Sequence, residues 1–360
     1  MTKLETSHTW QEIHAQPGIW QAWAAPLATQ SAEIREWIAA KGIKRIVFSG
    51  AGTSAFIGQA LASVKAGAIS LNAIPTTDIV SNPSETLSDD GELLVVQFGR
   101  SGNSSETIAT LDLLDEHFPK AHRLNITCNG ESALAVRAAK GPGEQRVIVL
   151  PAATHDQAFA MTSSYTTMLL SALACIDGTA DVAAKLEALS AAGAKALAQL
   201  DATPAPHPDR AIFLGSGALT GVSRESALKV LELTAGQVMT NWDSTLGFRH
   251  GPKASVVGNT RVIVFIHPDQ HTARYDRDIA VEIAQQFPTA TVTTVGGEGC
   301  DLALDLTGDS RWDAVLYVLL AQIWSARWSA ELDLNIDNPF IDQGNLTRVV
   351  SGVKIYPFAA

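Results

Sequence analysis

Short apolar runs alternate with longer amphipathic segments along most of this chain. The runs at 46–48, 93–98 and 261–266 lack the apolar–polar alternation of a strand with one exposed face, so they are typical of strands buried on both faces. The segments between such runs have helical patterns. Because buried strands that alternate with helices form parallel sheets covered on both faces, we predict an α/β protein with doubly wound parallel sheets.

The same pattern occurs twice, which indicates an internal repeat. Three landmarks of the first half recur in the same order in the second half: KRIVFSGAGTSAFIGQALAS as RAIFLGSGALTGVSRESAL, LLVVQF as RVIVFI, and FPKAHRLNITCNG as FPTATVTTVGG. Each copy therefore predicts one doubly wound domain. The predicted organisation is a helical arm at 1–29, a first domain at 30–178, a second domain at 195–332 and a tail at 333–360.

Composition narrows the possible functions. The chain has 360 residues, 46% hydrophobic and 18% charged, with a net charge of −11. A protein with this excess of negative charge binds nucleic acid and anionic membranes poorly. The start of the chain has no export signal, and no apolar stretch is long enough to cross a bilayer, so we expect a cytoplasmic protein. The three widely spaced cysteines are typical of buried, reduced thiols.

A first small-residue turn, GAGTSA, follows a predicted strand and contains Thr53 and Ser54. Its small residues let the backbone approach a ligand, and the helix that follows favours an anion. The turn also loosely matches the dinucleotide fingerprint GxGxxA. The acidic residue expected about 20 positions later is absent, so we expect no nicotinamide cofactor.

A second turn, GRSGNSSET, follows LLVVQF and suits a phosphate monoester better. Arg100 supplies a cation, Ser101 and Ser104 supply hydroxyls, and the backbone N–H groups of a helix start lie beside them. The alternative is a purely structural helix cap, with Asn103 at the N-cap position. The second repeat has IHPDQHTARYD at the equivalent place, without serines.

Glu225, Lys229 and Glu232 are spaced to share one face of a predicted helix. Two interpretations stay open at this point. The three can form an exposed salt-bridge ladder, which is the usual role of Glu–Lys pairs at this spacing. They can also form a catalytic stripe, because isomerising a sugar needs a rigidly held base that moves a proton between adjacent carbons.

His250 lies in the segment GFRHGPK, which predicts a loop rather than an apolar face. A loop histidine can open and close a sugar ring by proton transfer near neutral pH. The remaining histidines show no metal-binding spacing; His267 and His271 are four apart but lie in a turn-like segment. We therefore expect no metal centre.

Together, the segments GAGTSAFIG, FGRSGNSSET, THDQAFAMTSS, RESALKVLELTAG and GFRHGPK carry a resemblance. The chain resembles, over its whole length, the double sugar-isomerase (SIS) domain proteins known as tagatose-6-phosphate ketose/aldose isomerases or galactosamine-6-phosphate deaminases. It is more distantly similar to the isomerase half of glucosamine-6-phosphate synthase. The resemblance implies a sugar-phosphate substrate, no cofactor and a homodimer or higher homo-oligomer.

The resemblance also implies roles for individual residues. Glu232 would be the base that removes the carbon-bound proton, with Glu225 and Lys229 in support. His250 would open the ring from a neighbouring subunit. The residues that would hold the sugar phosphate are Thr53, Ser54, Arg100, Ser101 and Ser104.

One position departs from the more distant relative. Where that relative has an imine-forming lysine in its tail, this chain has Arg348, and arginine is no imine nucleophile. Lys354 is an alternative. The departure is compatible with an amino sugar, which brings its own nitrogen. We predict conversion of galactosamine 6-phosphate to tagatose 6-phosphate and ammonia; plain aldose–ketose isomerisation, deamination of glucosamine 6-phosphate and a non-catalytic sensor are the alternatives.

Overall fold

The computed structural model describes residues 2–63 and 67–358. Its contacts divide the chain into two compact units, each of which contains one five-stranded sheet. The N-sheet unit comprises Ala22–Asp156, Ser163–Lys185 and Thr347–Ala360. The C-sheet unit comprises Met1–Gln21, Gln157–Thr162 and Leu186–Leu346. The domain boundaries expected from linker composition stay predictions.

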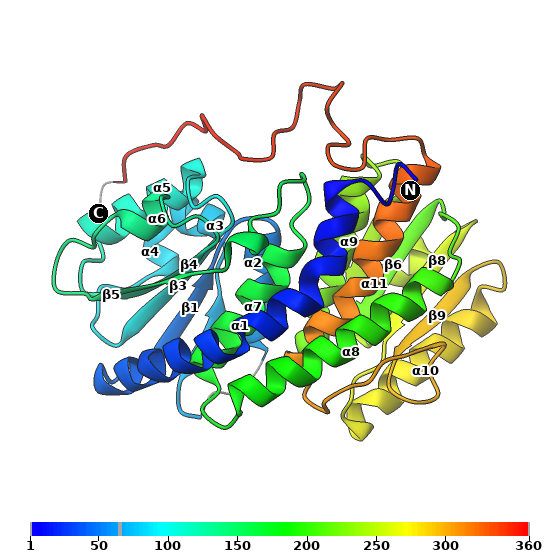
Figure 1. Cartoon of the computed structure of the whole chain (residues 1–360), viewed down its shortest axis with the longest axis horizontal. Coiled ribbons are helices and arrows are strands. Elements are labelled where there is room, and N and C mark those ends of the chain that lie inside the picture. Colours follow the sequence, from blue (N-terminus) through cyan, green and yellow to red (C-terminus); the bar gives the residue numbers. More distant parts are fainter. Residues whose placement is uncertain (1, 64–66, 359–360) are drawn as a thin grey trace. The chain divides into compact units, whose positions relative to one another are not determined.

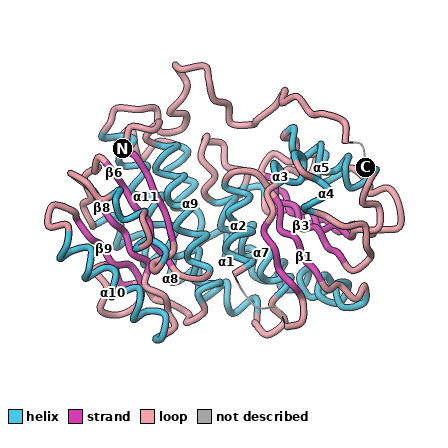
Figure 2. The backbone as a smooth tube through the Cα atoms, turned by 180° about the vertical axis from the view of Figure 1, so that it is seen from behind, coloured by secondary structure: helices cyan, strands magenta, loops and turns pink. Residues whose placement is uncertain are grey.

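The N-sheet has the strand order β2-β1-β3-β4-β5, and every neighbouring pair is parallel. Figure 1 labels β1, β3, β4 and β5 of this sheet, and Figure 2 shows the backbone from behind. The strand β3 lies at the centre of the sheet and is buried along its whole length, as its continuous apolar sequence predicts. The elements are β1 Arg45–Ser49, α2 Thr53–Ala62, β2 Ser70–Ala73, α3 Thr76–Ser81, α4 Pro83–Thr86, β3 Leu93–Gly99, α5 Ser105–Glu116, β4 His122–Thr127, α6 Ala133–Val136, β5 Gln145–Val149, η1 Ala152–Thr154 and α7 Ser163–Ile176.

The C-sheet has the order β10-β9-β8-β6-β7, again with parallel neighbours. The elements are β6 Arg210–Gly215, α9 Ala218–Leu233, β7 Met239–Asp243, η2 Gly247–Arg249, η3 Pro252–Ser255, β8 Thr260–Phe265, α10 Gln270–Gln286, β9 Thr291–Gly296, β10 Leu302–Ala303 and α11 Ser310–Glu331. Two further helices are α1 His8–Ala40 and α8 Val182–Ala202, each with residues in both units. Read from the opposite edge, this strand order is that of the N-sheet, so the predicted repeat and fold class are confirmed.

The repeat extends to backbone detail at the first turn of each sheet. Gly52 precedes α2 with φ 55° and ψ −129°, and Gly217 precedes α9 with φ 58° and ψ −126°. A positive φ disfavours any residue with a Cβ, so glycine is required at the same point of both copies. The first turn and the helix start that follows it are therefore equivalent in the two units, and differences in chemistry there depend on side chains.

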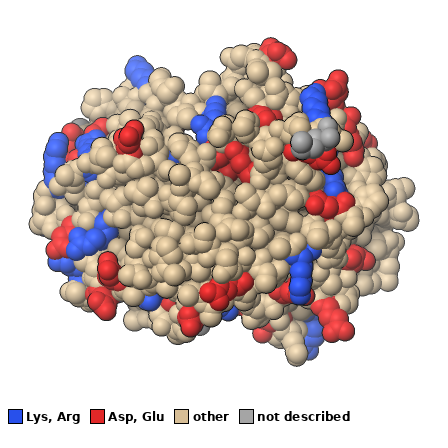
Figure 3. All heavy atoms as spheres, viewed as in Figure 1, with Lys and Arg blue, Asp and Glu red and all other residues tan. Residues whose placement is uncertain are grey.

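The structure also bears on the predictions about surface charge, membrane crossing and cysteine burial. On the face drawn in Figure 3, acidic and basic side chains are interspersed among uncharged ones. Among the described residues, no helix combines the length and apolar character that a membrane crossing demands. Cys128 and Cys175 are buried as expected, and burial raises the pKa of the Cys128 thiol to about 12. Cys300 is partly exposed, so the expectation of burial was wrong for this residue.

Candidate active site

The N-sheet unit carries the two predicted anion-binding turns at the carboxyl ends of β1 and β3, where open parallel sheets bind ligands. Thr53 and Ser54 form the first turn of α2, and both are buried. The turn needs glycine at position 50, because a Cβ there would lie 2.5 Å from the Cβ of Ser54. The backbone of this turn therefore packs tightly against the helix start that the small-residue pattern predicted.

The second turn leads from β3 into α5. Ser104 is the N-cap residue of α5: its Oγ accepts from Thr107 N at 3.3 Å and pairs with Thr107 Oγ1 at 2.8 Å. The alternative that placed Asn103 at the N-cap is wrong by one residue. The Oδ1 atom of Asn103 instead accepts from Ala133 N at 2.8 Å, because the turn folds against the segment before α6. Ser101 lies beside the turn and is partly exposed.

Arg100 is buried at this turn, and the C-terminal tail lies beside it. The guanidinium donates from Nη2 to the carbonyl oxygen of Arg348 at 3.2 Å. The side chain of Arg348 donates in turn to the carbonyl oxygen of Asp156. The tail continues along the start of α5, where Ser105 N donates to Val350 O at 3.3 Å. The structure therefore brings the predicted tail residue to the predicted phosphate turn, whereas Lys354 lies over the ring of Tyr356, 4.5 Å from its centroid.

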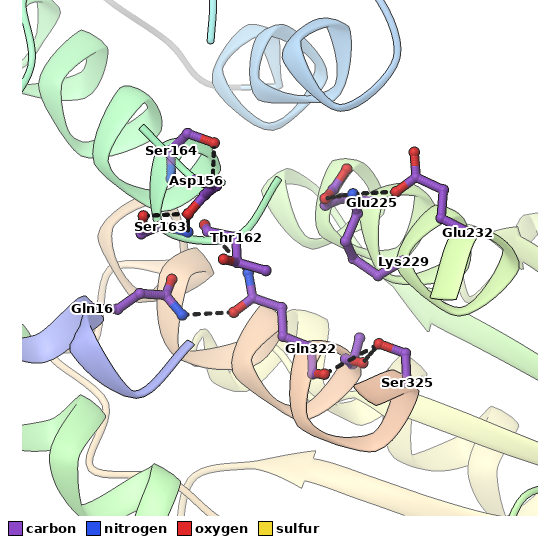
Figure 4. A network of polar contacts seen from close by, with 11 residues as sticks. Gln16, Asp156, Thr162, Ser163, Ser164, Glu225, Lys229, Glu232, Gln322 and Ser325 are labelled. Carbon is purple, nitrogen blue, oxygen red and sulfur yellow. Dashed lines mark hydrogen bonds and ion pairs between the residues drawn. The ribbon is translucent and has the colours of Figure 1, made fainter. Parts of the chain in front are cut away.

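Asp156, which was not among the predicted site residues, organises the same edge of the N-sheet. Its carboxylate is buried and accepts from the backbone N–H and the hydroxyl of both Ser163 and Ser164, at 2.5–3.1 Å (Figure 4). These bonds satisfy the N-terminal donors of α7. An aspartate seven and eight positions before a serine pair, within THDQAFAMTSS, was the signal available in the sequence.

The neighbouring His155 reports a cationic environment. Burial, followed by the charges of Arg348 and Arg100, lowers the pKa of its imidazole; Asp156 opposes this effect. An edge with two guanidinium groups and two helix starts is suited to a dianion, despite the acidic net charge of the whole protein.

The C-sheet unit carries the acid–base residues on α9. Glu225 and Lys229 are fully buried, and the Glu232 side chain is 23% exposed. Lys229 Nζ lies 2.6 Å from Glu232 Oε2 and 3.4 Å from Glu225 Oε1 (Figure 4). The exposed-ladder interpretation is therefore wrong. Burying a single charge costs several kcal/mol of free energy. The Lys229 ammonium and the two carboxylates beside it therefore form an ionic cluster whose opposite charges offset this cost.

His250 lies on a separate part of the C-sheet unit, in the turn that follows β7. Its backbone N–H donates to Gly247 O at 2.9 Å, and the residue is exposed. The flanking residues fix this turn to α10: Arg249 Nε lies 2.7 Å from Glu282 Oε2, and Lys253 pairs with the same carboxylate. Phe248 is buried in the core of the unit. The turn is thus anchored by its neighbours while the histidine faces outward.

A cavity of about 380 Å³ opens elsewhere on the C-sheet, at the carboxyl ends of β8 and β9. His267, Arg274 and Arg277 line it together with apolar and glycine residues. Neither Glu232 nor His250 lines it. Within residues 2–63 and 67–358, no group of three or more histidine, cysteine or acidic residues is placed to hold a metal ion.

Comparison with known proteins adds to this geometry. The SIS domain model matches residues 41–177. D-galactosamine-6-phosphate deaminase AgaS of Escherichia coli O157:H7 is 37% identical, over 98% of this chain and 97% of that protein. The protein of the same name from Shewanella sp. strain ANA-3 is 36% identical, over 99% and 94%. The crystal structure of tagatose-6-phosphate ketose/aldose isomerase from Escherichia coli superimposes with a TM-score of 0.89 and 32% identity, covering 100% of this chain and 99% of that one.

Proposed function

The chain belongs to the AgaS family of SIS-domain proteins, and on that premise we propose that it converts galactosamine 6-phosphate to tagatose 6-phosphate and ammonia. The observation that carries this proposal is the ionic cluster on α9. Glu232 is the partly exposed member, and Lys229 engages one of its carboxylate oxygens at 2.6 Å. A carboxylate oriented in this way suits the transfer of a proton between adjacent carbons.

Binding would begin at the N-sheet turns. We assign the phosphate to Thr53, Ser54, Arg100 and Ser101 and to the backbone N–H groups at the start of α5. The Ser104 hydroxyl caps that helix, so this residue would act mainly by holding the turn in place. Fixing one end of the sugar would lower the entropic cost of placing its reacting carbons beside the base.

The proposed chemistry has three steps. His250 moves a proton between the ring oxygen and the C1 hydroxyl, which opens the ring. Glu232 removes the proton from C2 and returns it to C1, so that the aldose amine becomes a ketose imine. Water adds to the C2 imine, and ammonia leaves as the ketone forms. No metal ion or organic cofactor takes part in this scheme.

The exposed position of His250 supports the proposal that it completes the site of a neighbouring subunit, so that the enzyme acts as a homodimer or a higher homo-oligomer. Arg348 would anchor the tail beside the phosphate rather than form an imine, because its guanidinium stays protonated. An amino sugar needs no lysine imine for this chemistry, since it carries its own nitrogen. We also propose a cytoplasmic location, where phosphorylated sugars are metabolised.

A panel of sugar phosphates tests the function. Galactosamine, glucosamine, tagatose and fructose 6-phosphates would be offered, and ammonia and ketose followed together. We expect ammonia and tagatose 6-phosphate in equal amounts from galactosamine 6-phosphate. Ketose–aldose exchange without ammonia would instead support isomerisation, which the name of the similar crystal structure favours. Binding without incorporation of solvent deuterium at carbon would identify a sensor.

The variant Glu232→Gln tests the base. It should abolish turnover and deuterium incorporation while a phosphate ester still binds, because the amide cannot accept the carbon-bound proton. Glu187→Gln, which alters an exposed carboxylate on α8, is the matched control and should behave like the wild type. Substantial turnover by Glu232→Gln would show that another group is the base.

A further inference from the structure

Asp276 is a fully buried carboxylate on α10 that the proposed chemistry does not use. Its Oδ1 accepts from Ser216 Oγ at 2.6 Å and from Thr245 Oγ1 at 2.9 Å. Its Oδ2 accepts from the backbone N–H of His267 at 2.9 Å. The two hydroxyls also lie 2.7 Å apart. One side chain therefore joins three segments that are distant in sequence.

The three segments are the loops at the carboxyl ends of β6, β7 and β8. Ser216 lies in the turn that starts α9, the helix of Glu232. Thr245 is buried in the turn that leads to His250. The Asp276 carboxylate is therefore the common acceptor for the elements that carry both groups of the proposed proton chemistry. The backbone N–H of His267 donates to the same carboxylate, so the loop at the end of β8 is also held by Asp276.

The donor set explains why this acceptor is a carboxylate. Two hydroxyls approach one oxygen and a backbone N–H approaches the other, so both oxygens face donors. An amide would lose the negative charge and would have to turn its NH₂ group toward the hydroxyls, which would then accept instead of donating. Hydrogen bonds to an ionised acceptor are also the stronger and shorter kind.

We propose that Asp276 is a positioning residue that holds the turn of His250 and the start of α9 in place, so that His250 reaches the site of the neighbouring subunit and Glu232 keeps its place in its own. This inference rests on the proposed function, because it assumes that His250 and Glu232 carry out the proton transfers. Asp276 would not touch the substrate. Glu282, six residues further along α10, holds the other end of the turn of His250 through Arg249 and Lys253.

The first test compares Asp276→Asn with Asp313→Asn. Asp313 is also fully buried in the C-sheet unit, where it accepts from Thr307 N at 2.8 Å and Gly308 N at 3.0 Å, in the segment that leads into α11. Both variants should lower the melting temperature. Only Asp276→Asn should lower kcat for ammonia release, by roughly 10²-fold as for a reacting group displaced by about 1 Å, with KM changed less than about twofold.

A second pair keeps the test valid if Asp276→Asn does not fold. Thr245→Val keeps the shape of the side chain and removes the hydroxyl that reaches Asp276, whereas Thr245→Ser keeps the hydroxyl. We expect Thr245→Val to lower kcat and Thr245→Ser to retain most of it. A role in stability alone would lower the melting temperature of Thr245→Val and leave kcat unchanged, which would overturn the proposal.

The failure of this inference is distinguishable from failure of the proposed function. If the wild type neither releases ammonia nor exchanges the C2 proton, the proposed function is wrong before any variant is compared. If the wild type is active and Asp276→Asn keeps its kcat, or if Asp313→Asn loses kcat equally, the positioning role is wrong and the function stands.

Discussion

The carboxyl edges of the two sheets share one backbone plan but have different charged groups. In both units, a glycine with φ near 55–58° precedes the first helix, and the strand order is the same. At the N-sheet edge, Arg100 and Arg348 lie beside two helix starts. At the C-sheet edge, the carboxylate of Asp276 takes hydrogen bonds from the loops. Both edges thus contain a buried carboxylate, Asp156 and Asp276, and the N-sheet edge adds two guanidinium groups beside its helix starts.

Two histidines at these edges show the difference electrostatically. Burial lowers the pKa of both His155 and His267. At His155 the nearby arginines lower it further, whereas at His267 the carboxylates of Asp276, Asp269 and Asp309 raise it against burial. A duplicated fold can therefore keep its turns while the charges around the histidines at the two edges diverge. In the proposed function, the N-sheet unit would anchor the phosphate and the C-sheet unit would hold the proton-transfer groups.

The largest effect should come from removing the internal cation of the C-sheet unit. Lys229→Met removes the ammonium that faces the fully buried Glu225 carboxylate, which should reduce the free energy of unfolding by about 3–5 kcal/mol. Denaturant unfolding would measure it. Lys195→Met is the control: its ion pair with Asp305 is exposed, so the loss should stay below about 1 kcal/mol. Equal losses in the two variants would contradict an essential buried cluster.

The next largest effect, on KM for the sugar phosphate, distinguishes which of the two sheet edges binds the phosphate. Arg100→Met should raise KM for the sugar phosphate by roughly 10–100-fold, the equivalent of one charge-assisted hydrogen bond, with kcat much less affected. Arg274→Met removes a cation from the cavity of the C-sheet and should leave KM within about twofold. Steady-state kinetics on both variants measure this. A larger KM effect from Arg274→Met would move the phosphate site to the other sheet.

A smaller loss of stability should follow from replacing either of the two equivalent glycines, Gly52 and Gly217. Gly52→Ala and Gly217→Ala each force a Cβ into a positive φ, at a cost of about 1–2 kcal/mol of stability. Both positions have room for the Cβ: its nearest contact is 3.7 Å at Gly217, and nothing lies within 4 Å at Gly52. The costs should therefore be similar in denaturant unfolding. KM should rise for Gly52→Ala alone, and a rise in both would mean that both turns bind the phosphate.

The smallest effects are changes in the pKa of His155 and His267, and they should have opposite signs at the two edges. Arg348→Met should raise the pKa of His155, because a nearby positive charge is lost. Asp276→Asn should lower the pKa of His267 further, because a negative charge is lost. Titration of the ring resonances by NMR would measure both shifts. Shifts in the same direction would contradict the difference in charge.

The same lowered pKa values predict how acid affects stability. A histidine whose pKa is lower in the folded than in the unfolded state binds a proton more readily when unfolded. Above about pH 6.5, His155 and His267 are neutral in both states and should not change the free energy of unfolding. As the pH decreases from that value toward their folded pKa values, the free energy of unfolding should fall. Thermal unfolding as a function of pH would measure the loss, and His155→Gln should reduce it.

Several features of the fold and the site could be predicted because they depend on residues close together in the chain. The apolar runs that became β3 and β8 predicted buried parallel strands. The turn GRSGNSSET predicted a helix start, although the cap is Ser104 rather than Asn103, because Asn103 bonds to Ala133 N, thirty positions further along the chain. The spacing of Glu225, Lys229 and Glu232 predicted a shared helix face, but spacing alone could not decide whether that face was buried.

By itself, the sequence determined the α/β class, the duplication and the chemical character of the candidate groups, because periodicity and turn composition are local properties. Only the tertiary structure decided the burial of Lys229 between its carboxylates, the contact of the Arg348 tail with Arg100, and the convergence of three loops on Asp276. The last two join residues 248 and 60 positions apart. The contacts of Asp276 arise because parallel strands bring their carboxyl ends to one edge, and the contact of Arg348 arises because the tail folds back onto the turn after β3; no local pattern records either.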